Sequence, residues 1–457
     1  MDRRSISLPL SLLTIETELL LPEETVVLAT KQPPALPDVP AALAAALADP
    51  IGCSPLAELA RQTLEGNGSA SAVVVISDNT RPVPYKGPAG IQWPIVECLL
   101  RSGFEPERVC ILVATGTHRA MTDSEISGLI DDRVTAAGVR VVSHDAHDPN
   151  ALVVVGDSPQ GTTIRMNREY VSADLKILTG LVESHFMAGV SGGRKSICPG
   201  LLGVQSVEEF HGAVMMEHPG TRSMNLTENL CHEYAVQVAR MMPPDFVVNV
   251  TIRDDGKPVG VFAGDIDRVL LSAFEQLKTF VLLPLPHRFD IVVTHGGRGA
   301  INHYQAVKAV TIGALATEQD GYLMVVADTI DADPIGNETY KEMLRLLKKL
   351  GPTEYRRLIS SSDWTLVPDQ WEAQMCAKTM ERVPEDHLFY YSPQTDPADY
   401  AFLPCAGYLP EWADAEAPQM VAHFIEEASR RITLTQGRRP RIAYLPDGPY
   451  GIPVETA

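Results

Sequence analysis

The segment SHFMAGVSGGRKSICPG places His185 and Lys195 ten residues apart, on either side of a glycine-rich stretch. An imidazole titrates near neutral pH, and a lysine amine can bind an anion or form a Schiff base, so the pair is suited to acid–base or covalent chemistry. The glycines could also form a purely structural turn, or present backbone N–H groups to a phosphate. The segment does not match the Walker pattern, because three residues separate Gly189 from Gly193 and Arg194 precedes Lys195.

Other polar residues follow apolar runs that predict buried strands. The motifs SDNTRP, TGTHR, GLVESHF and THGGRGAINHYQ each begin where such a run ends. In open α/β sheets, ligands bind beyond the carboxyl ends of the strands. The side chains that these strand ends would supply are Asp78, Arg81, His118, His185, Tyr304, Gln305 and Lys308. This placement favours a ligand site over a random scatter of polar residues.

Each of these groups also has a structural interpretation. The guanidinium of Arg81 suits a carboxylate or phosphate, but SDNTRP could equally be a capped turn with its arginine in water. Tyr304 and Lys308 lie four residues apart and would share one face of a helix, as in any amphipathic helix. Trp371 in WTLVPDQWEAQ could close a pocket or belong to the core. His211 in SVEEFHGAV could simply be a half-buried helix residue.

The elements that would position these residues alternate between short apolar runs and longer amphipathic ones, which predicts an α/β fold. Predicted strands cover residues 72–77, 109–115, 139–144, 175–180, 245–252, 290–296 and 322–328. Predicted helices include residues 90–101, 123–136, 204–216, 228–241 and 340–350. We therefore expect mixed or mostly parallel sheets flanked by helices.

A chain of 457 residues exceeds one ordinary hydrophobic core, so two domains are expected. The best linker is LLPLPHR, residues 282–288, because two prolines separate a helical run from a new strand. We predict an N-terminal α/β domain over residues 1–283 and a C-terminal α/β domain over residues 287–436. The tail, residues 437–457, is expected to pack back on the first domain.

The composition excludes several classes of partner. The formal net charge is −20 and no cluster of Lys or Arg occurs, which argues against nucleic acid and anionic membranes but leaves a small anion open. Seven cysteines without a CxxC pair favour a reducing, cytoplasmic location. No apolar stretch approaches the ~18 residues of a membrane span. Pro9, Glu16 and Glu18 interrupt the apolar N-terminus, which predicts an opening strand rather than a signal peptide.

Taken together and in order, the motifs SDNTRPVP, ATGTHRAMT, VESHFMAGVSGGRKSICPG, EEFHG, HYQAVKA and DQWEAQ resemble the lactate racemase family. The resemblance covers nearly the whole chain, and its spacing is specific, because His211 lies sixteen residues after Lys195 and Lys195 ten after His185. It implies a racemase or epimerase of 2-hydroxy acids with its active site in a cleft between two α/β domains. The family uses a nickel-pincer nucleotide, Ni(II)-pyridinium-3,5-bisthiocarboxylate mononucleotide, which separate biosynthetic enzymes supply.

The resemblance also implies roles for individual residues. The lysine that matches Lys195 is covalently attached to the cofactor, and the histidine that matches His211 is the protein's nickel ligand. His118 and His185 match two bases that serve opposite faces of the substrate while a hydride moves from C2 to the cofactor and back. The glycines before Lys195 would let the backbone approach the flat cofactor. Residues expected to contact the cofactor are Asp78, Asn79, Thr80, Arg81, Gln305 and Lys308, and those expected to contact the substrate are Arg81, Tyr304, Lys308 and Trp371.

The identity of the substrate is left open by the sequence. Many family members carry an acidic residue shortly before the Tyr-Gln pair, whereas this chain has Arg298, Ala300 and His303 there. An added cation would favour a second carboxylate or a polyhydroxy acid, so a sugar-acid epimerase on the same scaffold is an alternative. Two further classes are a non-catalytic nucleotide-binding protein and a pyridoxal-phosphate enzyme with Lys195 as its Schiff base. A homo-oligomer is compatible with each of these.

Overall fold

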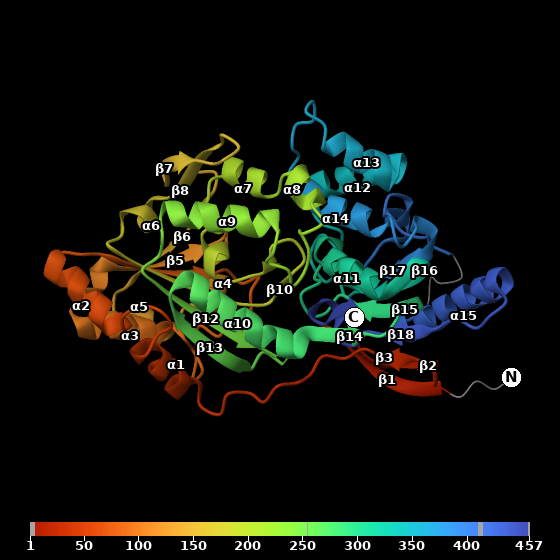
Figure 1. Cartoon of the computed structure of the whole chain (residues 1–457), viewed down its shortest axis with the longest axis horizontal. Coiled ribbons are helices and arrows are strands. Elements are labelled where there is room, and N and C mark those ends of the chain that lie inside the picture. Colours follow the sequence, from red (N-terminus) through yellow and green to blue (C-terminus); the bar gives the residue numbers. More distant parts are fainter. Residues whose placement is uncertain (1–4, 254, 410–414, 456–457) are drawn as a thin grey trace. The chain divides into compact units, whose positions relative to one another are not determined.

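The computed structural model describes residues 5–253, 255–409 and 415–455, and it divides the chain into two compact units (Figure 1). Unit 1 comprises Met1–Lys31, Gly212–Glu217 and Val281–Ala457. Unit 2 comprises Gln32–His211 and His218–Phe280. Each unit is an α/β layer structure around its own sheet, which confirms the predicted fold class.

Unit 2 is built on a six-stranded sheet with the strand order β13-β12-β9-β4-β5-β6. All neighbours are parallel except β12 and β13, which are antiparallel. The central strands are buried on both faces, which explains why AVVVIS and VCILVA are continuous apolar runs rather than alternating ones. The bounds are β4 Ala72–Ser77, β5 Val109–Ala114, β6 Arg140–Ser143, β9 Leu175–Leu181, β12 Phe246–Ile252 and β13 Pro258–Gly264.

The helices and small sheets of unit 2 complete its layers. The helices are α1 Val39–Ala48, α2 Leu56–Gly66, α3 Gln92–Ser102, α4 Asp123–Leu129, α5 Asp132–Ala136, α6 Arg168–Ser172, α7 Val204–Phe210, α9 Leu230–Met241 and α10 Ile266–Val281. A hairpin is formed by β7 Leu152–Asp157 and β8 Thr163–Asn167, and a second two-stranded pair by β10 Ser184–His185 and β11 Gly189–Val190. A 3-10 turn, η2 Gly193–Ser196, follows β11 and carries Lys195.

Unit 1 contains a five-stranded, all-parallel sheet with the strand order β17-β16-β15-β18-β3. Its strands are β3 Val26–Val27, β15 Phe289–His295, β16 Thr317–Val326, β17 Leu388–Tyr391 and β18 Ile442–Tyr444. Two smaller pairs are β1 Ser5–Ser11 with β2 Glu16–Pro22, and β14 Leu282–Leu285 with β19 Ile452–Glu455. The helices are α8 Ala213–Glu217, α11 His303–Ala316, α12 Glu338–Leu350, α13 Pro352–Ile359, α14 Gln370–Thr379 and α15 Ala417–Gln436.

The two ends of the chain depart from the expected domain boundaries. Residues 1–31 were expected in the N-terminal domain, but β3 pairs with β18 and thus completes the sheet of unit 1. Leucines of β1 and β2, including Leu19 and Leu21, share one hydrophobic core with α15. The tail pairs with β3 through β18 and with β14 through β19, so it contacts residues of the predicted N-terminal domain that the structure places in unit 1. These pairings join strands that lie far apart in the chain, and nothing in the local sequence signals them.

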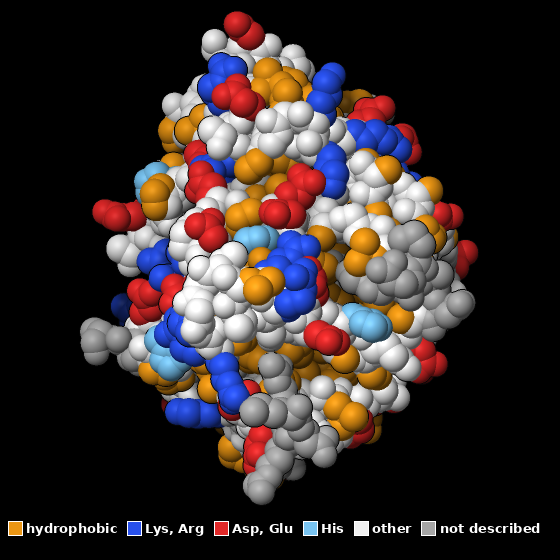
Figure 2. All heavy atoms as spheres, turned by 90° about the vertical axis from the view of Figure 1, so that its right-hand side faces the viewer, with side chains coloured by type: hydrophobic (Ala, Val, Ile, Leu, Met, Phe, Trp, Pro, Cys, Tyr) orange, Lys and Arg blue, Asp and Glu red, His pale blue; other side chains and the backbone are white. Residues whose placement is uncertain are grey.

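The hydropathy of the helices and the distribution of surface charge are the features relevant to membrane and nucleic-acid partners. In the part of the chain that the structure describes, no helix is both long and apolar enough to cross a membrane. Figure 2 views the side of the molecule that carries α15, and basic and acidic side chains are interspersed on this face rather than gathered by sign.

Candidate active site

Asp78 and His118 form a hydrogen-bonded pair at the carboxyl ends of two neighbouring strands. Asp78 directly follows β4, His118 lies in the loop after β5, and these strands are parallel. The Oδ2 atom of Asp78 lies 2.6 Å from Nδ1 of His118. Its Oδ1 accepts hydrogen bonds from the backbone N–H of Thr80 at 3.1 Å and from the Thr80 hydroxyl at 2.5 Å. Both oxygens of the Asp78 carboxylate therefore form hydrogen bonds within the chain.

This pairing keeps Asp78 ionised and fixes the orientation of the His118 ring. Burial alone would raise the pKa of Asp78, but hydrogen bonds from His118 and Thr80 and the charge of Arg81 hold it below its usual value. An ionised Asp78 accepts a hydrogen bond from Nδ1–H of His118, which in the neutral ring leaves the lone pair on Nε2. The His118 side chain is half exposed whereas that of Asp78 is buried, so the base faces outward and its partner is fixed beneath it.

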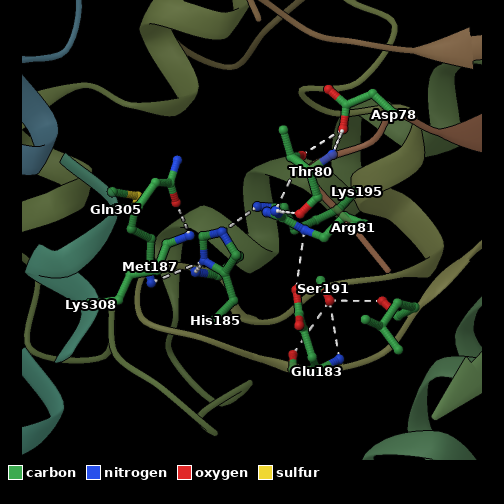
Figure 3. Close-up of polar contacts among 12 residues, drawn as sticks. Asp78, Thr80, Arg81, Glu183, His185, Met187, Ser191, Lys195, Gln305 and Lys308 are labelled. Carbon is green, nitrogen blue, oxygen red and sulfur yellow. Dashed lines mark hydrogen bonds and ion pairs between the residues drawn. The ribbon is translucent and has the colours of Figure 1, made fainter. Parts of the chain in front are cut away.

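Arg81 is held by a carboxylate that the sequence analysis did not single out. Its Nε lies 3.1 Å from Oε1 of Glu183, and its Nη1 donates to the Thr80 carbonyl at 3.1 Å (Figure 3). Both partners of the ion pair are partly buried. Glu183 immediately precedes β10, so the strand-end rule could have found it in GLVESHF. Asn79 of the same motif is instead turned to Glu125, with its Nδ2 donating at 2.9 Å.

His185 and Lys195 are brought together by the glycine-rich bend between them, residues 186–194. In Figure 3 the two side chains point toward each other, and Nε2 of His185 lies 2.9 Å from Nζ of Lys195. The backbone N–H groups of Met187 and Ala188 both donate to Nδ1 of His185, at 3.2 and 3.3 Å. A neutral imidazole has one N–H, so its proton lies on Nε2 and is donated to Lys195. Because Nζ of Lys195 accepts this hydrogen bond, Lys195 is an uncharged amine in this contact.

The electrostatic surroundings of Lys195 favour the same state. Burial, together with the positive charges of Arg81 and Arg194, lowers the pKa of Lys195 to about 7. A lysine with such a pKa is substantially deprotonated near neutral pH and can act as a nucleophile. The sequence predicted the proximity of His185 and Lys195 only through their spacing, and the structure supplies the contact.

Acylation should detect this uncharged amine directly. With p-nitrophenyl acetate, the acetylation rate at Lys195 should reach half its maximum near pH 7, because the deprotonated amine is the nucleophile. Acetylation of ordinary surface lysines should still increase above about pH 9, since their amines remain protonated below that. Peptide mass mapping across pH 5–10 measures both at once. A rate at Lys195 that follows the surface lysines would contradict the assignment.

His211 has the protonation state that metal ligation requires. It caps the C-terminus of α7, where its Nδ1 lies 2.9 Å from the Val207 carbonyl and must therefore donate. The remaining nitrogen, Nε2, then carries the lone pair. Burial, with smaller contributions from Lys195 and His118, lowers the pKa of His211 to about 3. The predicted helix over residues 204–216 is in fact broken here, at Gly212, into α7 and α8.

The glycines of the bend serve the chain's own packing. Gly189 has φ +77°, and a Cβ on it would lie 2.2 Å from the Asn225 carbonyl oxygen. Gly192 also has φ +77°, and its Cβ would lie 2.5 Å from Oδ1 of Asn249. Left-handed backbone and close approach both demand glycine at these positions. The expectation that the glycines make room for a flat cofactor is therefore not needed to explain them.

In unit 1, the predicted residues form a second group on α11 and α14. Nζ of Lys308 donates to Oε1 of Gln305 at 2.5 Å, and Nε1 of Trp371 donates to the Tyr304 hydroxyl at 2.9 Å. Trp371 is buried, so it contributes to the core as well as fixing Tyr304. The roles expected for these four residues toward cofactor and substrate stay predictions.

Sequence reasoning missed a buried carboxyl beside this group. Glu372 is buried on α14, and burial raises its pKa to about 8, with the charge of Lys308 opposing the rise and that of Asp369 adding to it. Burial and these two carboxyls also raise the pKa of Tyr304 well above its usual value. The motif DQWEAQ offered no signal, because α14 is buried on all sides and shows no amphipathic pattern.

The expected extra cation near the Tyr-Gln pair is not His303. This side chain is buried, its Nδ1 lies 3.0 Å from the Tyr340 hydroxyl, and burial lowers its pKa to about 3. His303 is therefore neutral and part of the packing of unit 1. Arg298, the other unusual residue before the Tyr-Gln pair, is exposed. The expectation of a second carboxylate in the substrate stays a prediction.

Comparison with known proteins shows which family the chain resembles. Residues 14–223 match the lactate racemase N-terminal domain, and residues 286–388 match the lactate racemase C-terminal domain. The chain is 30% identical over 404 residues to a lactate racemase of Lactiplantibacillus plantarum, with 88% of each chain covered. It is 32% identical over 337 residues to a lactate racemase of Thermoanaerobacterium thermosaccharolyticum, with 73% of this chain and 76% of the relative covered.

A solved structure extends the match to three dimensions. The lactate racemase apoprotein from Thermoanaerobacterium thermosaccharolyticum superposes with a TM-score of 0.83 at 26% identity, covering 98% of this chain and 100% of that one. The sequence resemblance is thus confirmed by domain, by whole-chain identity and by fold. The chain belongs to the lactate racemase family and is an isomerase of the racemase type.

Proposed function

We propose that this chain interconverts the enantiomers of lactate or a closely related 2-hydroxy acid, with a nickel-pincer nucleotide attached to Lys195. The observation that carries the proposal is the 2.9 Å contact between Lys195 and His185. It supplies an uncharged amine for covalent attachment beside an imidazole suited to proton transfer. The family relationship makes a nickel-dependent cofactor the expected one.

The side chains present fit such a group. Lys195 offers a nucleophilic nitrogen, and the neutral ring of His211 offers one imidazole ligand. Among the residues that the structure describes, no cluster of three or more His, Cys, Asp or Glu could hold a metal ion by itself. A nickel ion here would thus need donors from an organic ligand. When bound, the cofactor would accept the hydride from C2 of the substrate and return it.

His118 and His185 are the candidate groups that accept the proton of the substrate hydroxyl and return it. The C2–H bond beside a carboxylate is weakly acidic, so simple proton abstraction from carbon is unfavourable. Nε2 of His118 can take the hydroxyl proton, and the Asp78 carboxylate then stabilises the imidazolium across the 2.6 Å hydrogen bond. His185 is the candidate base for the other enantiomer, and it can act as one only once Nε2 no longer carries the proton that it donates to Lys195 in the unmodified chain. Its Nε2 faces Lys195, so modification of that amine changes the hydrogen bonding of His185.

Arg81 is the candidate anchor for an anionic group. Its guanidinium is fixed by Glu183 on one side and by the Thr80 carbonyl on the other. A guanidinium held in place binds a carboxylate or phosphate with less loss of side-chain entropy than a mobile one. An anchored carboxylate would keep the planar keto acid in the site while it presents its second face.

Removing the charge of Asp78 should slow catalysis without abolishing binding. In Asp78→Asn the imidazolium of His118 loses its ionic partner, so we expect kcat to fall about 10- to 100-fold with KM little changed. The pH profile of kcat should also shift, which a purely structural role would not cause. Asp132→Asn, an exposed carboxylate of unit 2, is the matched control and should behave as the unaltered enzyme. Equal kcat in both variants would contradict the role of Asp78.

The function itself is tested by loading the chain and offering substrates. The protein should be co-expressed with the cofactor-biosynthesis enzymes and incubated with a panel of chiral 2-hydroxy acids in deuterated water. Hydride return predicts racemisation with C2 largely unlabelled, whereas a proton-transfer racemase would incorporate deuterium. Turnover of aldonic acids but not of lactate would indicate a sugar-acid epimerase. A fully loaded protein that racemises none of them would refute the proposal.

A further inference from the structure

Arg194, which directly precedes Lys195, is a buried cation inside unit 2. Only 1% of its surface is exposed. Burial lowers the pKa of its guanidinium to about 9, which shows how unfavourable the surroundings are for the charge. In the described ranges it forms no ion pair with a carboxylate. Burying an arginine without an ionic partner costs free energy, so we expect Arg194 to have a structural or functional role that offsets this cost.

Its hydrogen bonds run almost entirely to backbone carbonyls of the glycine-rich bend. Nη2 donates to the Ala188 carbonyl at 2.8 Å. Nη1 donates to the carbonyls of Ser191 and Gly192 at 3.3 and 3.2 Å. The guanidinium thus lies inside the bend and ties both of its sides to one rigid, planar group.

The fourth hydrogen bond fixes the guanidinium to a helix. Nε of Arg194 donates at 3.1 Å to Nδ1 of His232, on α9. Burial and the charge of Arg194 lower the pKa of His232 to about 4, so this ring is neutral and its Nδ1 can accept. The bend is therefore anchored through Arg194 to α9.

The peptide groups held by Arg194 are those that orient the reactive pair. The N–H of Ala188 donates to Nδ1 of His185, and the carbonyl of the same residue accepts from Arg194. Lys195 is the next residue in η2, whose preceding backbone is fixed by the carbonyls of Ser191 and Gly192. One guanidinium therefore constrains both ends of the contact between His185 and Lys195.

We propose that Arg194 is the positioning residue for His185 and Lys195, holding the amine of Lys195 aligned for covalent attachment. His232 supports it from α9. The guanidinium of Arg194 donates to His232 and to three backbone carbonyls, so it acts on His185 and Lys195 through the backbone. The proposal deepens the proposed function, since it concerns the same attachment site, but its test does not depend on turnover.

The test measures acetylation of Lys195 by p-nitrophenyl acetate in the unloaded full-length chain. The amine nitrogen attacks the ester carbonyl, a C–N bond forms, the C–O bond breaks, p-nitrophenolate leaves with the electron pair, and the amine proton passes to buffer. In Arg194→Ala the rate at Lys195 should fall about tenfold or more, because small misplacements of a reacting group cost large factors in rate. Added guanidinium ion should restore part of it. Arg240→Ala, an exposed arginine of α9, is the control.

A second pair of variants covers the case in which Arg194→Ala does not fold. His232→Ala removes the acceptor for Nε, and acetylation at Lys195 should fall severalfold. His232→Asn keeps an acceptor near the position of Nδ1 and should recover most of the rate. If the variants fold and p-nitrophenyl acetate still acetylates Lys195 at the unaltered rate, the proposal is overturned. If racemisation is absent but these rates change as expected, the proposed function fails while the positioning role of Arg194 stands.

Discussion

Lys195→Met, co-expressed with the cofactor-biosynthesis enzymes, should carry no covalent adduct and should show no racemisation above background. Methionine has nearly the length of lysine but no nucleophilic nitrogen, so no C–N bond to the cofactor can form. Because the cofactor supplies the hydride chemistry, its loss removes the whole rate enhancement rather than a fraction of it. Intact-mass measurement, nickel content and a racemisation assay on one preparation give three independent readouts.

Lys195→Arg separates charge from nucleophilicity. Arginine keeps a cation at this position but stays protonated at all accessible pH values, so it should also lack the adduct. Lys176→Met, on β9 of the same unit, should load and turn over normally. An adduct of cofactor mass on Lys195→Met would show that another residue is the attachment point.

His118→Gln and His185→Gln should each lower kcat for racemisation about 10²- to 10⁴-fold, the usual range for loss of a general acid–base group. Racemisation needs both bases, because each enantiomer presents its hydroxyl to a different side of the planar keto acid. In a single turnover, however, each variant should still oxidise one enantiomer. We expect the keto acid to form from opposite enantiomers in the two variants.

This opposite preference is the decisive measurement. Rapid-quench analysis of the keto acid from each pure enantiomer distinguishes two bases on opposite faces from one base with an accessory histidine. His147→Gln, an exposed histidine of unit 2, is the control and should oxidise both. If both variants lose the same enantiomer, the two-base arrangement is wrong.

The parts of the fold that sequence patterns predicted are those with local causes. Strands β4, β5, β9, β12, β15 and β16 were found because strands buried on both faces are continuous apolar runs. The predicted helix over residues 123–136 is instead two short helices, because Asp131 caps a new start at α5. A capping aspartate inside an amphipathic stretch is easily taken for a surface residue.

The candidate site was predicted by residue type and motif, but its contacts were not. His118, His185, Lys195 and His211 were identified, whereas Asp78 was assigned to the cofactor although it also holds His118. That contact spans 40 positions in the chain and depends on the parallel pairing of β4 with β5. Arg194 and Glu372 were missed, since a charged residue in the sequence gives no sign of whether it is buried. Glu183 was missed although it lies at a strand end, where the strand-end rule could have found it.

The pairing of β3 with β18 makes unit 1 discontinuous in sequence. This limits which fragments of the chain can be produced separately and still fold. A fragment that begins near residue 286 would lack β1, β2 and β3 and would expose the apolar side of α15 to water. Such a fragment is expected to aggregate. Fusing residues 1–31 in front of residues 281–457 through a short flexible linker would restore the missing strands.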